Sequence, residues 1–250
     1  MEKIDPDIRK ANTIQGSFYT SNDSFDNTIE KIFATSWQFI SDDSKLQHDK
    51  NALPFQYLGN LIPERLVLIN NKNKISCFSN VCTHRGNILI NDTCNIKNNI
   101  TCGYHGKQFD SFGKFKFMPK TEGMKNFPTE KDNLTEISVG RWNQFVFASL
   151  APKIKFTELF KEINERIEWM PIKDFKFSKT LSKDYYVDAN WALYCDNYLE
   201  GFHIPFIHKD LNDVLDFKNY DIEINKYSNL QIGIASETDI CFDLPKSSKD

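Results

Sequence analysis

The strongest constraint on the fold of this chain is a pair of metal-ligand motifs separated by 17 residues. Cys82-Thr83-His84 and Cys102-Gly103-Tyr104-His105 each offer one thiolate and one imidazole. Thiolates are the usual ligands of iron–sulfur clusters, and a cluster with two imidazoles in place of two thiolates has a raised reduction potential. The chain must therefore fold so that two separate loops face one another across a metal centre.

The residues around both motifs predict a β scaffold for these loops. Residues 65–70 and 74–79 have the composition of two strands joined by a polar turn, and the second strand leads into the first motif. Residues 99–117 predict a second hairpin with its turn at 111–113, and residues 139–150 a closing strand.

The first motif resembles the Rieske [2Fe–2S] family. The resemblance implies a [2Fe–2S] cluster bound by Cys82, His84, Cys102 and His105. Rieske proteins of respiratory complexes carry an extra cysteine in each cluster loop; here Asn87 and Tyr104 stand at those positions, which is typical of the oxygenase and ferredoxin branch. The alternative is a structural zinc site of Cys₂His₂ type, although zinc sites more often pair like ligands.

A second cluster of ligand residues lies in the stretch Asp196–His208. His203 and His208 are too far round a continuous helix to bind one metal together, so we expect Pro205 to break a helix over residues 190–203 and bring His208 back. Two histidines and one carboxylate are a common ligand set for non-haem iron. The aromatic residues of this stretch recur at helical spacing, which favours core packing over a substrate-lining role: Trp191, Tyr194, Tyr198 and Phe202.

This second stretch resembles the catalytic (alpha) subunits of Rieske non-haem iron oxygenases, of the aromatic-ring-hydroxylating and choline- and carnitine-monooxygenase superfamily. The resemblance implies that His203 and His208 bind a mononuclear Fe(II), with Asn197 beside it. It also implies that Glu200 bridges this iron to a Rieske histidine, His105, of a neighbouring subunit. Glutamate at this position is typical of the carnitine and choline branch.

The carboxylate ligand of the iron is the missing part. In the family it comes from a later C-terminal helix, and the nearby acids do not occupy a position that the family uses: Asp210, Asp213, Asp216, Asp239 and Asp243. We therefore expect a truncated or split oxygenase subunit whose third iron ligand is absent from this chain.

The expected fold is α+β, in three parts. Residues 1–35 form a helical segment with a helix at 24–34 capped by Ser24, and residues 36–150 an all-β Rieske domain. Residues 151–250 form the N-terminal part of a helix-grip catalytic domain. In this last part we expect a helix at 157–170 and strands near 174–188 and 219–235.

Charge and composition narrow the function. A net charge of −3 gives no reason to expect nucleic acid as a partner, and no apolar run is long enough to cross a membrane, so a cytoplasmic location is expected. The resemblance implies electrons from an NAD(P)H-dependent reductase or a ferredoxin, O₂ and a small organic substrate, and a homotrimer. The substrate would be hydroxylated, dihydroxylated or oxidatively demethylated, and a quaternary ammonium compound fits the branch. Two alternatives are a Rieske electron-transfer protein without a working mononuclear iron and a helix-grip ligand-binding protein.

Overall fold

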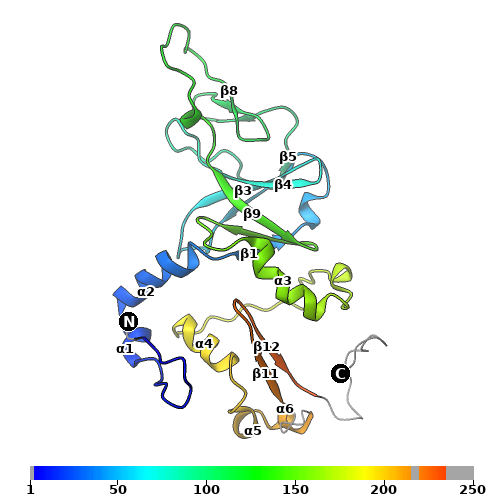
Figure 1. Cartoon of the computed structure of the whole chain (residues 1–250). Coiled ribbons are helices and arrows are strands. Elements are labelled where there is room, and N and C mark those ends of the chain that lie inside the picture. Colours follow the sequence, from blue (N-terminus) through cyan, green and yellow to red (C-terminus); the bar gives the residue numbers. More distant parts are fainter. Residues whose placement is uncertain (1–2, 215–219, 235–250) are drawn as a thin grey trace. The chain divides into compact units, whose positions relative to one another are not determined.

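The structure is a computed structural model that describes residues 3–214 and 220–234. Its internal contacts divide the chain into two units. Figure 1 labels elements of both units along the chain. Residues Asn27–Phe156 form one unit, here called the β unit. Met1–Asp26 and Thr157–Asp250 form the other, here called the mixed unit. The α+β class is confirmed.

The β unit is built from one large and one small antiparallel sheet. The large sheet has the strand order β1-β10-β9-β4-β3-β2-β5, and the small sheet the order β6-β7-β8. The strands are β1 (Gln38–Asp42), β2 (Asn51–Gln56), β3 (Arg65–Asn71), β4 (Lys74–Ser79), β5 (Cys94–Asn95), β6 (Ile100–Thr101), β7 (Gln108–Phe109), β8 (Phe115–Phe117), β9 (Glu136–Trp142) and β10 (Phe145–Ser149). Two short 3₁₀ turns, η2 (Ser44–Leu46) and η3 (Glu130–Asp132), complete it.

Strand β3 is buried on both of its faces and so divides the core in two. Leu66 and Leu68 pack on one side with residues of β10, while Val67 and Ile69 pack on the other side. Side chains alternate between the two faces of a strand, so one apolar run serves both cores. The second core also contains Cys82 and Cys102, so the sheet directly supports the metal motifs.

Most of the strands predicted in the β unit are confirmed, with two corrections. The β3–β4 hairpin lies where it was predicted, and its turn residues Lys72 and Asn73 have positive φ. Residues 139–150 are not one strand but the larger part of the β9–β10 hairpin, which turns at Asn143 with φ 52°. Residues 99–117 contain three strands and not two, because the second metal motif separates β6 from β7.

The predicted helix at 24–34 begins earlier and changes its winding. Helix α2 (Asn22–Thr28) continues into a π-helical turn, η1 (Ile29–Phe33). Ser24 is not its cap, because it lies inside the helix. The Ser21 hydroxyl precedes the helix and accepts a hydrogen bond of 3.3 Å from the backbone N–H of Ser24.

In its described residues the mixed unit contains short helices and one hairpin. The helices are α1 (Gly16–Thr20), α3 (Phe156–Ile167), the 3₁₀ turn η4 (Ile172–Asp174), α4 (Trp191–Tyr198), α5 (Ile204–Ile207) and α6 (Lys209–Val214). Strands β11 (Asp221–Ile224) and β12 (Asn229–Ile232) pair antiparallel. Arg166 of α3 forms an ion pair of 2.9 Å with Glu223, so the helix and the hairpin are joined.

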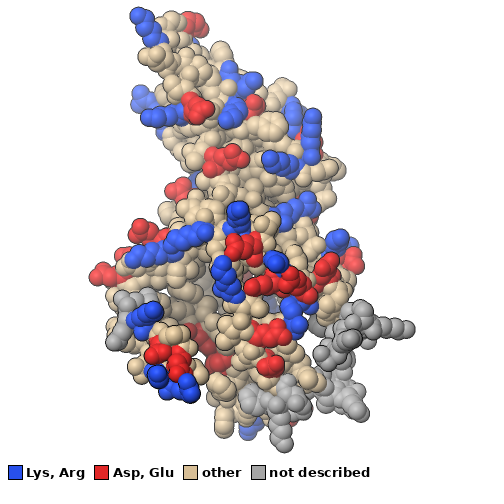
Figure 2. Space-filling model, viewed as in Figure 1, with Lys and Arg blue, Asp and Glu red and all other residues tan. Residues whose placement is uncertain are grey.

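The strands expected near 174–188 are wrong, because the structure describes irregular backbone there. Phe177, Tyr185 and Tyr186 favour a strand by composition, but they are exposed, and none of the described strands pairs with this segment. No helix among the described residues is long and apolar enough to span a membrane. Figure 2 shows basic and acidic side chains intermixed over the visible face.

Gly140 of β9 is required by close packing in the β unit. A Cβ atom at this position would lie 2.3 Å from the ring of Phe156. That ring is fixed against Trp37, with centroids 5.1 Å apart, and the Trp37 indole donates a hydrogen bond to the Ile154 carbonyl. The ring therefore has little room to retreat.

We expect Gly140→Ala to lower the free energy of unfolding by about 1–3 kcal/mol, the usual cost of an overpacked core. Thermal or denaturant unfolding of the full chain measures this change. Gly16→Ala is the matched control, because a Cβ atom there would have no atom within 4 Å, and it should not destabilise. Equal stability of the Gly140 variant would show that Phe156 is free to move.

Candidate metal centres

The two cluster loops are built by the same hydrogen-bond pattern. In the first, the Cys82 N–H donates to the Asn87 carbonyl at 2.8 Å and the Gly86 N–H donates to the Cys82 carbonyl at 3.0 Å. In the second, Cys102 and Lys107 repeat the first bond at 2.8 Å, and Gly106 and Cys102 repeat the second at 3.0 Å. Each turn closes through a glycine of positive φ, 74° and 71°, which side chains rarely allow.

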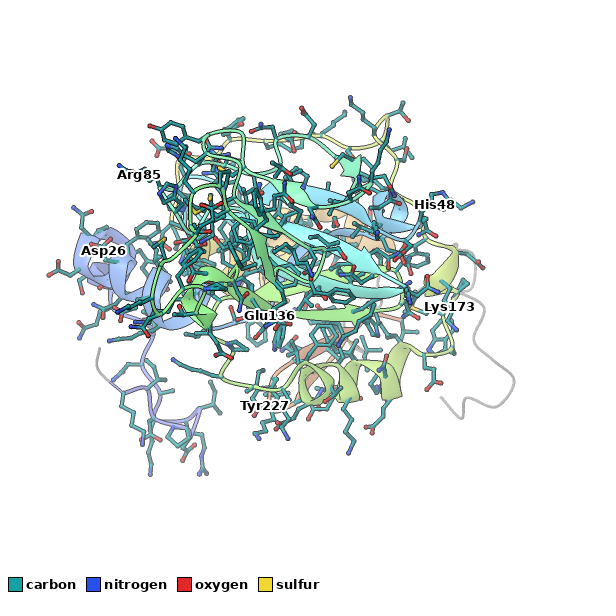
Figure 3. The ribbon with its side chains drawn as sticks, turned by 90° about the horizontal axis from the view of Figure 1, so that it is seen from above. Asp26, His48, Arg85, Glu136, Lys173 and Tyr227 are labelled. Atoms are coloured by element: carbon teal, nitrogen blue, oxygen red, sulfur yellow. The ribbon has the colours of Figure 1, made fainter. Side chains whose placement is uncertain are left out.

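These loops bring the four predicted ligands together in two layers. Cys82 and Cys102 are each only 3% exposed, and their thiols form a hydrogen bond with one another. His84 and His105 are exposed, and their ring centroids lie 4.7 Å apart. Figure 3 places Arg85, which follows His84, at the end of the β unit opposite His48. The sulfur pair therefore lies inside the protein and the nitrogen pair at its surface.

The local electrostatics differ between the two thiols. Burial raises the pKa of the Cys82 thiol. Burial also acts to raise the pKa of Cys102, but hydrogen bonds from the backbone of Tyr104 and His105 lower it overall. Hydrogen bonds to the charged form favour that form, so this loop is prepared to hold a thiolate, the form in which cysteine binds metal.

The donor set fits a two-iron cluster better than one zinc ion. A Cys₂His₂ zinc site needs all four donors around one point. Over residues 3–214 and 220–234, no group of three or more His, Cys, Asp or Glu side chains is arranged to hold a single ion. Two buried sulfurs and two exposed nitrogens instead match a cluster in which one iron takes two cysteines and the other takes two histidines.

The second motif lies on two helices separated by a turn. Helix α4 begins after Asn190, whose side chain accepts a hydrogen bond of 3.0 Å from the Ala192 N–H. It ends at Tyr198, so the single helix predicted over 190–203 is wrong. Pro205 does not break that helix; it lies in the first turn of α5, where proline is favoured because its missing N–H has no helical partner.

The turn between these helices brings the two histidines together. The ring centroids of His203 and His208 are 5.1 Å apart, and the rings are nearly perpendicular. Glu200 lies in the turn, and its Oε1 is 2.5 Å from Nδ1 of His203. A carboxylate on one ring nitrogen orients the imidazole and leaves the other nitrogen for a metal.

Glu200 is held as a carboxylate by its surroundings. Burial acts to raise its pKa, but the hydrogen bonds from His203 and from the Phe202 N–H lower it overall. The Phe202 N–H donates to Oε2 at 2.5 Å, so both carboxylate oxygens have partners within the turn. A negative charge on Glu200 favours the orientation of His203 at neutral pH.

The contacts that hold this turn are not predicted by the sequence. Gly201 faces the ring of Tyr220, which would lie 2.6 Å from a Cβ atom there. The Tyr220 hydroxyl donates to the Gln231 side chain, and the Gln231 amide donates to the Tyr198 carbonyl. No periodicity or motif indicates these contacts, because they join side chains and backbone from separate elements of the chain.

The remaining predicted residues do not complete the iron site. Asn197 is exposed on α4, and the structure describes no hydrogen bond from it to either histidine. Asp210 and Asp213 are exposed and form no three-donor group with the histidines, while Asp216, Asp239 and Asp243 lie outside the described residues. The described residues therefore supply two donors of a facial triad. The core packing expected for Trp191, Tyr194, Tyr198 and Phe202 is wrong for the last three, which are exposed, whereas Trp191 is half-buried.

Two family models match this chain over the regions that hold the two sites. Residues 36–128 match the Rieske [2Fe–2S] domain, and residues 167–236 match the ring-hydroxylating alpha subunit catalytic domain. The chain carries a Rieske [2Fe–2S] domain and matches the ring-hydroxylating alpha subunit catalytic domain. The first domain implies a [2Fe–2S] cluster and the second a mononuclear iron.

The relatives are 26–30% identical to this chain in sequence. The chain is 29% identical to a carnitine monooxygenase oxygenase subunit of Acinetobacter pittii over 98% of its length, and covers 65% of that protein. The chain is 26% identical to a chloroplastic choline monooxygenase of Arabidopsis thaliana. The match extends over 92% of this chain and 56% of the plant protein. The chain thus spans less than two thirds of the length of these relatives.

The solved structure of a quaternary ammonium Rieske monooxygenase has a similar fold. It superposes with a TM-score of 0.75 at 28% identity, over 90% of this chain and 62% of that one. The similarity therefore extends over both the region of the cluster loops and the region of the second motif.

The contact between Glu200 and His203 gives a testable consequence for metal affinity. We expect Glu200→Gln to weaken binding of Fe(II) at the histidine pair by about 10–100-fold, the usual effect of losing a carboxylate behind a metal-bound histidine. Titration of the iron-depleted chain with Fe(II) measures this affinity. Glu168→Gln removes an exposed charge from the same unit and should change nothing. Equal affinities of the two variants would contradict the role of Glu200.

Proposed function

We propose that this chain provides the oxygenase component of a Rieske monooxygenase that acts on a small quaternary ammonium compound. The single observation that carries this proposal is the occurrence in one chain of two preformed histidine pairs, one beside two buried cysteines and one beside a carboxylate. We further propose that residues 36–150 form the cluster domain and residues 151–250 part of the catalytic domain, after a helical segment at residues 1–35. A cytoplasmic location remains a prediction.

The relatives support the substrate class. They are named as carnitine and choline monooxygenases, and both compounds carry a quaternary ammonium group. Cations of this type bind on the faces of aromatic rings. The exposed rings of Tyr194, Tyr198 and Phe202 stand on the same segment as the histidine pair and could supply such faces. This role replaces the core packing expected for them.

The protein residues would divide the work between the two sites. Cys82, His84, Cys102 and His105 would hold the cluster, and His203 and His208 would provide two ligands of the iron. When bound, these cofactors supply one-electron transfer and oxygen activation. Glu200 would keep the His203 imidazole oriented, and Asn197 would lie beside the iron.

Electron supply and assembly follow from the same proposal. We propose that an NAD(P)H-dependent reductase, directly or through a ferredoxin, delivers single electrons to the cluster. We also propose a homotrimer in which Glu200 links the iron site of one copy to His105 of a neighbouring copy. The exposed position of His105 is compatible with such a contact.

The first test is the metal content of anaerobically purified chain. Iron and acid-labile sulfide in about a 3:2 ratio would mean that both sites load. Oxygen consumption is then measured with NADH, a Rieske oxygenase reductase and one added compound at a time. We expect consumption with L-carnitine or choline and none with naphthalene. A response to naphthalene alone would overturn the proposed substrate class.

The second candidate function is electron transfer by the cluster alone. The observation that favours it is that, among residues 3–214 and 220–234, no third His, Cys, Asp or Glu side chain is arranged with His203 and His208 to hold one ion. It predicts iron and sulfide in about a 1:1 ratio, with the spectrum of a reduced Rieske cluster and no substrate-dependent oxygen consumption.

A further inference from the structure

Lys107 is a charged side chain in the interior of the β unit. It is only 1% exposed, and it is the one lysine, arginine, aspartate or glutamate in the buried set of the described residues. A buried ammonium is costly unless it is paired, so its surroundings must be specifically arranged. It lies two residues after His105, at the end of the second cluster loop and immediately before β7.

The surroundings of the ammonium group are one carboxylate and three aromatic rings. Nζ lies 2.9 Å from Oδ1 of Asp132. It also lies 5.4–5.9 Å from the ring centroids of Phe109, Phe115 and Phe127, within the range of cation–π attraction. The other carboxylate oxygen of Asp132 accepts a hydrogen bond from the Thr129 N–H, so the acid is held from both sides.

The Lys107–Asp132 ion pair is connected to both cluster loops. The Lys107 carbonyl accepts the hydrogen bond from the Cys102 N–H that closes the second loop. The Asp132 carbonyl accepts a hydrogen bond of 2.9 Å from the Thr83 hydroxyl, which stands between Cys82 and His84 in the first loop. This ion pair, between a buried lysine and a partly buried aspartate, therefore joins the backbones that carry all four cluster ligands.

We propose that the buried Lys107 ammonium, restrained by Asp132 and the aromatic rings, raises the reduction potential of the [2Fe–2S] cluster held by the adjacent loops. This inference rests on the proposed cluster. One-electron reduction by an external donor adds one negative charge at the site and moves no proton. A fixed positive charge in a low-dielectric interior stabilises the reduced state more than the oxidised state, which raises the potential.

The negative charge of Asp132 opposes the effect of Lys107 on the reduction potential. Substitutions of the two residues therefore test the proposal. The Asp132 charge should lower the potential that Lys107 raises, so the two substitutions must shift the potential in opposite directions. A merely structural role predicts something else, because breaking the ion pair from either side would loosen the same loops. Loosened loops would change the potential in the same direction in both variants, or lower the cluster content of both.

The experiment is an anaerobic redox titration of the full cluster-loaded chain with mediators, followed by visible circular dichroism. We expect Lys107→Met to decrease the equilibrium constant of one-electron reduction about tenfold, a shift of about 59 mV to more negative potential. We expect Asp132→Asn to shift the potential to a more positive value. Lys131→Met, which removes an exposed charge beside Asp132, should leave the potential unchanged.

Asp132→Asn keeps the shape of the carboxylate and the ammonium, so it is the variant that tests the proposal if Lys107→Met does not fold. An unchanged or more negative potential in Asp132→Asn would overturn the inference while leaving the proposed function intact. Iron and sulfide are measured on the same samples. A wild-type chain without sulfide would overturn both the inference and the proposed function.

Discussion

Replacement of Cys102 by serine is expected to remove the iron–sulfur cluster. Cys102 is buried in the core beside Cys82, and backbone hydrogen bonds in its loop favour the thiolate that iron binds. A serine hydroxyl is a poor substitute because it stays protonated at neutral pH and is a harder donor. We expect acid-labile sulfide to fall to a small fraction of the wild-type content, with loss of the visible absorption of the cluster.

Cys94 provides the matched control for this substitution. It is an exposed cysteine of β5 in the same unit, and it lies between the two ligand motifs without belonging to either. Cys94→Ser should keep the full content of iron and sulfide and the same unfolding temperature. A Cys102 variant that retained the wild-type sulfide content would contradict the assignment of this residue as a ligand.

The β unit could be predicted well because its local signals agree with its tertiary contacts. The apolar runs of β3 and β4, the polar turn between them and the glycine in each cluster loop are all consistent with the same arrangement. The β9–β10 turn was missed because Asn143 adopts positive φ without a neighbouring glycine or proline to mark it. The apolar residues on both sides of Asn143 and Gln144 therefore resembled one strand, although the chain reverses between them.

The second motif was harder to predict because its geometry depends on contacts that are distant in sequence. The apolar spacing of Tyr194, Tyr198 and Phe202 continues past the actual end of α4 at Tyr198. The turn is formed instead by Glu200, which accepts the Phe202 N–H, and by the ring of Tyr220 over Gly201. The ligand residues could be identified from their types and spacing, whereas the residues that position them could be identified only from the structure.

Dependence on distant contacts also explains why the prediction of strands near 174–188 was wrong. Strand propensity describes how well a residue fits a pleated, half-buried surface. Phe177, Tyr185 and Tyr186 have that propensity, but no neighbouring strand is described against which they could be buried. Composition indicates what a segment could form, while pairing depends on a partner that local sequence does not specify.

Loss of His208 should affect one metal centre and leave the other intact. The ring of His208 lies beside that of His203, but it has no described contact with Glu200, so its removal should leave the carboxylate–histidine pair in place. We expect His208→Ala to lose the mononuclear iron, because one imidazole cannot hold it, and to keep the [2Fe–2S] cluster. Iron to sulfide should fall from about 3:2 to about 1:1, and substrate-dependent oxygen consumption should fall below detection.

His48 is the matched control, since it is the one histidine outside the two pairs and is exposed between η2 and β2. His48→Ala should keep both the metal ratio and the oxygen consumption. Loss of sulfide in His208→Ala would mean that this histidine supports the fold of the cluster domain. An unchanged iron content would mean that His208 is not a ligand, and the electron-transfer function would then account better for the chain.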